Sequence, residues 1–152
     1  MKKICFIAST GGHLDQLMML RPIIDKHNSF IVTEKTEYNS IKSNKKIYYL
    51  YQVNRLERTW ILKMIINTFI SLYIFLLKRP EIVISTGVLA TIPMCLIAKI
   101  FRKRIIYIES FAKVNSPTLT GKLMYRCANE FYVQWEEMLK VYPNAIYKGG
   151  IY

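Results

Sequence analysis

The stretch ICFIASTGGHL, residues 4–14, decides the fold because it joins an apolar run to a glycine turn and the start of a helix. The run 4–8 predicts a buried β-strand, and the apolar residues at 14, 17 and 18 have the spacing of a helix. Two glycines at such a junction let backbone N–H groups approach a ligand, and the helix start adds a partial positive charge. The stretch therefore predicts an anion site, although glycine also serves tight turns for purely steric reasons.

Motifs near this junction narrow the chemistry. His13 falls on the first turn of the predicted helix, where its side chain can reach whatever the loop binds. The sequence contains neither the dinucleotide fingerprint G-x-G-x-x-G nor the lysine of a P-loop, which argues against a dinucleotide-binding protein and a nucleoside triphosphatase. It also contains no G-x-S-x-G, so serine-hydrolase chemistry is disfavoured.

Composition bounds the class of protein. A chain of 152 residues fits one domain, 1–152, and 52% hydrophobic residues suffice for a full core. The net charge of +12 indicates an anionic partner, and so many apolar residues favour an anionic membrane surface over RNA or DNA. Because no RNP, helix-turn-helix or zinc pattern occurs, we expect no nucleic-acid partner.

Cysteines and the start of the chain indicate the compartment. Cys5, Cys95 and Cys127 match neither a metal-site spacing nor a CxxC redox pair, so we expect reduced thiols in a cytosolic protein. With only two histidines, a histidine-based metal site is not expected either. The first residues lead directly into the predicted strand, and we expect no signal peptide.

Strand and helix patterns alternate along the whole chain. The predicted strands are 3–8, 30–33, 46–50, 81–85, 104–109, 130–133 and 145–147. The predicted helices are 12–20, 61–77, 89–101, 116–129 and 135–142. Pro22 ends or kinks the first helix, and Ser116 with Pro117 forms a good start for the fourth. Short Ile- and Val-rich strands between helices predict an α/β fold with a Rossmann-like, doubly wound parallel sheet.

The segment 61–77, ILKMIINTFISLYIFLL, is unusually apolar. It falls just short of the ~20 residues of a spanning helix, and a span here would also divide the sheet. A helix packed only on the sheet usually keeps a polar face, which this segment hardly has. A helix with one side on the sheet and the other on a bilayer fits best, and the other two placements stay open. Its predicted membrane contacts are Arg58, Trp60, Lys63, Phe69, Tyr73, Phe75, Lys78 and Arg79.

Three loops are predicted to converge, because all strands of a parallel sheet end at the edge where ligands bind. They follow the first, fourth and fifth strands, at 9–13, 85–88 and 109–111. The predicted diphosphate-binding residues are Thr10, Gly11, Gly12, Ser85, Thr86 and Gly87. His13 and Glu109 are candidate general bases for an acceptor hydroxyl. Glu109 has a second interpretation, as a carboxylate that caps a helix or pairs with a cation.

The order of these loops resembles the acceptor half of GT-B glycosyltransferases. The matching segments are Gly-Gly-His at 11–13, Ser-Thr-Gly at 85–87 and Ile-Glu-Ser-Phe-Ala at 108–112. Over essentially its full length the chain resembles the PssD/CpsF-type subunit of bacterial capsule and exopolysaccharide synthesis. That subunit is similar to the membrane-anchoring subunit of the eukaryotic transferase that adds the second GlcNAc to dolichol diphosphate-GlcNAc, and to the N-terminal half of MurG.

The resemblance implies a function shared between two chains. A GT-B enzyme has two Rossmann-like domains, and the second usually holds the sugar nucleotide. This sequence ends just after its last predicted strand, so the resemblance implies a separate donor-binding glycosyltransferase subunit and a heterodimer. The pair would transfer a sugar from a UDP-sugar to a polyprenyl diphosphate-linked saccharide, with no cofactor and no metal.

The resemblance also implies roles for particular residues. Gly11, Gly12 and His13 match the loop that meets the acceptor diphosphate, and Glu109 matches an acidic residue of the acceptor-side motif. The eukaryotic subunit has an N-terminal membrane helix that we do not expect here, so attachment to the cytoplasmic face of the cell membrane falls to 61–77. The alternative function is a non-catalytic membrane scaffold that recruits and stabilises the catalytic partner.

Overall fold

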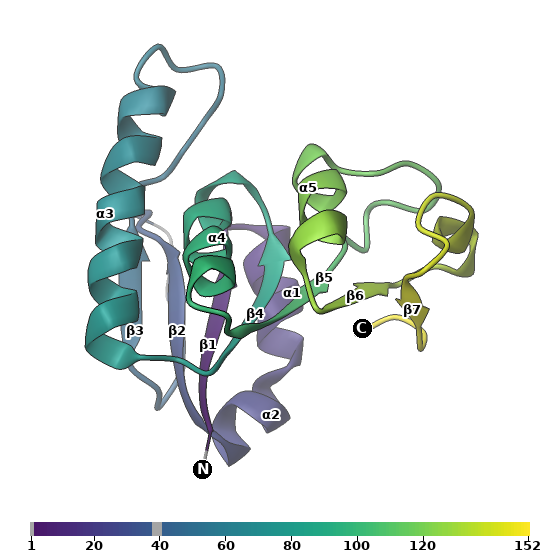
Figure 1. Cartoon of the computed structure of the whole chain (residues 1–152), viewed down its shortest axis with the longest axis horizontal. Coiled ribbons are helices and arrows are strands. Elements are labelled where there is room, and N and C mark those ends of the chain that lie inside the picture. The colour runs from purple at the N-terminus through teal and green to yellow at the C-terminus, as the bar shows by residue number, and fades with distance from the viewer. Residues whose placement is uncertain (1, 38–40) are drawn as a thin grey trace.

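The computed structural model describes residues 2–37 and 41–152, and within them seven parallel strands form one sheet (Figure 1). The strands are β1 (Lys3–Ala8), β2 (Asn28–Glu34), β3 (Ile47–Leu50), β4 (Ile82–Gly87), β5 (Arg104–Ile108), β6 (Glu130–Val133) and β7 (Ile146–Tyr147). They lie in the order β3-β2-β1-β4-β5-β6-β7, and each neighbouring pair is parallel. The strand order reverses between β1 and β4, which confirms the predicted α/β, doubly wound fold.

Helices connect the strands on both faces of this sheet. They are α1 (Gly12–Met19), α2 (Arg21–Lys26), α3 (Trp60–Lys78), α4 (Ile92–Ile100) and α5 (Leu119–Cys127), with 3₁₀ turns η1 (Leu89–Thr91) and η2 (Glu136–Lys140). Pro22 does more than end the first helix, because it lies in the first turn of the separate helix α2. A proline fits there since the first N–H groups of a helix have no partner in any case.

The start of α5 differs from the prediction. Its cap is Thr118 and not Ser116, and Pro117 lies before the helix. Thr118 has an extended backbone, and its hydroxyl oxygen accepts a hydrogen bond from the Gly121 N–H at 2.7 Å. A threonine at this position satisfies an N–H group that the helix itself leaves unpaired.

The central strands send alternate side chains into two separate cores, one on each face of the sheet. In β1, Cys5 and Ile7 join the core that contains residues of α3, α4 and α5. Ile4 and Phe6 join the other core, which contains residues of α1 and α2. Because both faces are covered, apolar residues occupy both sides of the central strands, as the sequence predicted.

Candidate functional site

The two glycine turns meet at the ends of β1 and β4. The Ser9 N–H donates to the Gly87 carbonyl oxygen at 2.7 Å, and the Val88 N–H donates to Ser9 Oγ at 3.1 Å. The Thr86 hydroxyl donates to the His13 carbonyl oxygen at 2.7 Å. These hydrogen bonds join segments more than seventy residues apart (|i−j| of 73 for His13 and Thr86), and they bring together two of the three loops, those after β1 and β4.

His13 is oriented by its neighbour on β4. Its Nδ1 lies 2.9 Å from the Thr86 carbonyl oxygen. A carbonyl oxygen can only accept, so Nδ1 carries a proton, and in the neutral form of the imidazole the lone pair is on Nε2. The ring therefore presents a proton acceptor at the edge of the sheet where parallel α/β proteins bind ligands.

The start of α1 is open. Gly11 occupies the cap position, and no side chain there satisfies the first N–H groups of the helix. A Cβ atom added at Gly11 or Gly12 would meet nothing within 4 Å, so the space beside the turn is unfilled by the protein. Open N–H groups at a helix start are typical of anion sites, and the binding of a phosphate group by α1 stays a prediction.

Gly87 is required for a different reason. Its φ is +91°, and a Cβ there would lie 2.8 Å from Tyr107 Oη. Tyr107 is fully buried, and burial together with the nearby Glu109 carboxylate raises the pKa of its phenol well above the usual value. Gly87 thus lets the end of β4 pack against this ring and beside His13, which serves positioning more directly than ligand contact.

The structure corrects the predicted role of two hydroxyls. β4 continues to Gly87, so Ser85 and Thr86 lie within the strand and are fully buried. Ser85 Oγ accepts from the Gly87 N–H at 3.1 Å, and Thr86 Oγ1 is committed to the His13 carbonyl oxygen. Neither hydroxyl can therefore reach a diphosphate, and both instead fix the shape of the loops. Thr10 is half-buried, and its role in binding stays a prediction.

Glu109 lies beneath the start of α5 and is only 1% exposed. Its carboxylate accepts hydrogen bonds from the Ser110 N–H at 2.9 Å and from the hydroxyls of Thr118 and Tyr142, each at 3.0 Å. Burial and this carboxylate raise the pKa of the Tyr142 phenol above its usual value. The geometry favours the capping interpretation of Glu109 over the catalytic one.

A glycine in α5 makes this arrangement fit. A Cβ at Gly121 would lie 1.9 Å from Glu109 Oε2, so only glycine lets the first turn of α5 approach the carboxylate. The combination of Thr118 and Gly121, shortly after an acidic residue that ends a strand, is the signal by which the capping role could have been identified.

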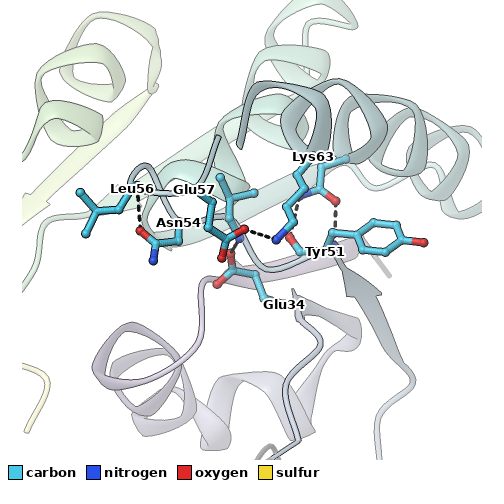
Figure 2. A network of polar contacts seen from close by, with 8 residues as sticks. Glu34, Tyr51, Asn54, Leu56, Glu57 and Lys63 are labelled. Carbon is cyan, nitrogen blue, oxygen red and sulfur yellow. Dashed lines mark hydrogen bonds and ion pairs between the residues drawn. The ribbon is translucent and has the colours of Figure 1, made fainter. Parts of the chain in front are cut away.

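Glu34 is a site residue that the sequence analysis missed. It ends β2 and is 4% exposed. Its Oε2 accepts from the Thr10 N–H at 3.1 Å, and its Oε1 accepts from the Val53 N–H at 2.8 Å. Glu34 thereby joins the glycine turn to residues 51–59, the strap that leads from β3 to α3 (Figure 2). An acidic residue at the end of the apolar run 30–33 was the available signal.

A cavity of about 660 Å³ opens at this edge of the sheet. Its walls come from 9–10, 34, 52–55, 88–89, 113 and 117–120. Thr10 lines it, whereas Gly11, Gly12 and His13 follow directly in the chain and are not part of its wall. The cavity therefore adjoins the open start of α1. Across residues 2–37 and 41–152, no three His, Cys, Asp or Glu side chains form a metal-binding group.

α3 turns most of its large apolar residues outward. Its exposed large side chains are Ile61, Leu62, Ile65, Ile66, Phe69, Tyr73, Leu76 and Leu77. Asn67 and Ser71, by contrast, are fully buried against the protein. Within the described residues α3 is the one helix long and apolar enough to cross a membrane. Only 22% of an apolar 18-residue stretch of this helix is buried. This distribution is the reverse of an ordinary surface helix.

The predicted membrane contacts divide into three groups. Phe69 and Tyr73 are 68% and 67% exposed, and Arg58 and Arg79 are exposed at the two ends of the helix. The half-buried members are Trp60, Lys63, which pairs with Glu57, and Lys78. Phe75 is a correction, because it is 3% exposed and its ring packs 5.1 Å from that of Phe101.

The chain matches the family described as "Oligosaccharide biosynthesis protein Alg14 like" over residues 4–151. A curated relative is the UDP-N-acetylglucosamine transferase subunit ALG14 of Mus musculus, 23% identical over 180 residues, which covers 98% of this chain and 82% of the relative. The subunit of the same name from Saccharomyces cerevisiae is 36% identical over 66 residues, which covers 43% of this chain and 28% of the relative.

Solved structures share the fold. MurG of Acinetobacter baumannii superposes with a TM-score of 0.73 at 18% identity, over 90% of this chain and 42% of MurG. MnaA of S. aureus, solved with UDP, superposes with a TM-score of 0.73 at 15% identity, over 99% of this chain and 44% of MnaA. The chain thus spans less than half the length of either protein, and its fold is that of one half of MurG.

Proposed function

The chain belongs to the Alg14-like family, and from this premise we propose that it is the acceptor-binding, membrane-associated subunit of a two-chain glycosyltransferase. Its relatives are named as subunits of a UDP-N-acetylglucosamine transferase, which supports a separate donor-binding chain. The pair transfers a sugar from a UDP-sugar to a polyprenyl diphosphate-linked saccharide in capsule or exopolysaccharide synthesis.

The observation that carries this proposal is that the His13 ring, oriented by the Thr86 carbonyl oxygen, lies in the open first turn of α1. The helix start receives the acceptor diphosphate. The Nε2 atom of His13 accepts the proton of the acceptor hydroxyl as the hydroxyl oxygen attacks the anomeric carbon of the UDP-sugar. The bond from that carbon to the diphosphate oxygen of the UDP-sugar breaks, and UDP leaves. General-base catalysis of this kind contributes about 10²–10⁴-fold to the rate.

The position of α3 supports attachment at the cytoplasmic face of the membrane. Its outward apolar side, with arginines at both ends, is the pattern of a helix that lies in a bilayer interface. The start of α3 follows the strap at 51–59, and Glu34 ties that strap to the glycine turn. A lipid-linked acceptor would therefore present its diphosphate close to the surface on which α3 lies.

The test is a transfer assay with radiolabelled UDP-GlcNAc and a polyprenyl diphosphate-linked sugar. We expect activity from this chain together with a donor-binding chain of the same organism, and none from this chain alone. His13→Ala should lower the rate of the pair about 10²–10⁴-fold without loss of assembly. His27→Ala, the other histidine and the cap residue that ends α2, is the matched control.

A second candidate, the non-catalytic scaffold, is favoured by one observation. Ser85, Thr86 and Glu109, which carry part of the family resemblance, are all buried and hydrogen-bonded within the chain. If the partner alone transfers sugar to the lipid-linked acceptor at the full rate, or His13→Ala leaves the rate of the pair unchanged, the scaffold replaces the catalytic proposal.

A further inference from the structure

Two cations flank the cavity at the edge of the sheet. Arg55 lies on the strap between β3 and α3, and Lys113 lies on the loop between β5 and α5. In the sheet order β3-β2-β1-β4-β5, the glycine turns after β1 and β4 lie between these two loops. The cations therefore approach the same space from opposite sides of the glycine turns.

Neither cation is paired with another side chain across 2–37 and 41–152. Among the residues that the structure describes, the guanidinium of Arg55 and the ammonium of Lys113 make no hydrogen bond or ion pair. The carboxylate in the same wall, Glu34, is engaged with the Thr10 and Val53 N–H groups. Val53 is two residues before Arg55, so its hydrogen bond to Glu34 holds this part of the strap beside the cavity.

We propose that Arg55 and Lys113 form a two-cation clamp for the diphosphate of an isoprenoid diphosphate. This inference rests on the proposed function and deepens it, because it assigns the residues that complete the acceptor site. Cationic side chains make short, charge-assisted hydrogen bonds to phosphate oxygens. The open start of α1 supplies N–H donors next to the cavity, so the diphosphate is held between the helix start and the clamp.

The cavity wall favours an isoprenoid over a nucleotide. Val88, Leu89 and Leu119 give it apolar surface, and Leu119 is 62% exposed. Among the described residues that line it, none is aromatic, so a uracil base finds no ring on which to stack. The chemistry of the wall thus fits a charged diphosphate followed by a hydrocarbon chain.

Calorimetric titration of the full chain tests the clamp, with farnesyl diphosphate and UDP as the two probes. We expect wild type to bind farnesyl diphosphate more tightly than UDP. Arg55→Gln and Lys113→Gln should each weaken farnesyl diphosphate binding about tenfold, and the double variant about a hundredfold. The double variant Lys26→Gln/Arg126→Gln removes the same charge from exposed positions outside the cavity and should bind like wild type.

Each outcome decides between the inference and the function on which it rests. If the double clamp variant binds farnesyl diphosphate as tightly as wild type, the clamp is wrong and the proposed function stands. If wild type binds no farnesyl diphosphate, both are wrong. If UDP binds more tightly and depends on the same two cations, the site belongs to the donor and the inference is overturned. Arg55→Lys/Lys113→Arg, which keeps both charges, should retain most of the affinity and guards against loss of folding.

Discussion

α3 and α4 are neighbouring apolar helices on the same face of the sheet (Figure 1), yet the side chains that α3 buries include polar ones, whereas those that α4 buries are all apolar. α4 buries Met94 and Cys95 completely, as expected of a helix in a core. α3 buries Asn67 and Ser71 completely and leaves Phe69 68% exposed. Composition therefore does not determine which side of an apolar helix faces inward; in α3 the hydrogen bonds of Asn67 do.

The partner in α3 is the backbone just beyond β3. The Asn67 side chain accepts from the Tyr51 N–H and donates to the Tyr51 carbonyl oxygen, each at 2.8 Å. β3 is the edge of the described sheet, so no further strand is available to pair with the chain as it leaves that edge. The amide of Asn67 takes the place of a strand, and this turns the polar side of α3 inward.

The largest difference between the two helices should appear in stability. Met94→Ala in α4 removes a fully buried side chain and should lower the free energy of unfolding by about 2–5 kcal/mol. Phe69→Ala in α3 removes a larger but exposed side chain and should change it by less than about 0.5 kcal/mol. Urea denaturation of the two variants measures this, and equal losses would mean that α3 is packed like α4.

Removal of the buried Asn67 amide should have the next largest effect on the free energy of unfolding. Asn67→Ala removes both hydrogen bonds to the Tyr51 backbone from a fully buried side chain, which should cost about 1–3 kcal/mol of unfolding free energy. Thr68→Ala is the control, because the exposed Thr68 hydroxyl bonds only to the Met64 carbonyl oxygen one turn earlier. Similar stability of the two variants in thermal unfolding would contradict the role given to Asn67.

The arginines at the ends of α3 should contribute less, and only on charged membranes. Arg58→Gln and Arg79→Gln should each weaken binding to vesicles with anionic lipid by about 1 kcal/mol, or about fivefold. Co-sedimentation with anionic and with neutral vesicles separates this contribution from the apolar one. An equal loss on both kinds of vesicle would show that charge attraction is not the reason.

Thiol labelling compares the accessibility of α3 and α4 with the smallest expected change in stability. Burial raises the pKa of Cys95 in α4 to about 12, so its thiol stays protonated at about pH 8, and a thiolate-specific reagent should reach it only on unfolding. A cysteine placed on the outward side of α3, Phe69→Cys, should react at once and become protected when vesicles are added. Rapid labelling of Cys95 in the folded chain would contradict the burial of α4.

The sequence predicted the position of α3 better than its orientation. The apolar run and the following Lys78, Arg79 and Pro80 placed both ends of the helix within one residue. Asn67 and Ser71, four residues apart, mark one side of the helix, but the contact that turns that side inward lies at Tyr51, sixteen positions earlier (|i−j| of 16). A non-local hydrogen bond of this kind has no local pattern.

The candidate site shows the same limit. Convergence of the glycine turns followed from topology alone, since parallel strands end at one edge. The hydrogen bonds that engage the hydroxyls of Ser85 and Thr86 did not follow from topology, because they depend on β4 continuing to Gly87. The burial of Glu109 depends on how closely Gly121 lets α5 approach, which is a tertiary contact.

The most direct test compares two acceptors in the reconstituted pair of chains: a long-chain lipid-linked sugar in anionic vesicles and a short-chain soluble analogue. Phe69→Asp/Tyr73→Asp, on the outward side of α3, should lose activity on the vesicle-borne acceptor and keep it on the soluble one. His13→Ala should lose activity on both. Full activity of the α3 variant on vesicles, or of the His13 variant on either acceptor, would contradict the account of a membrane-held acceptor subunit.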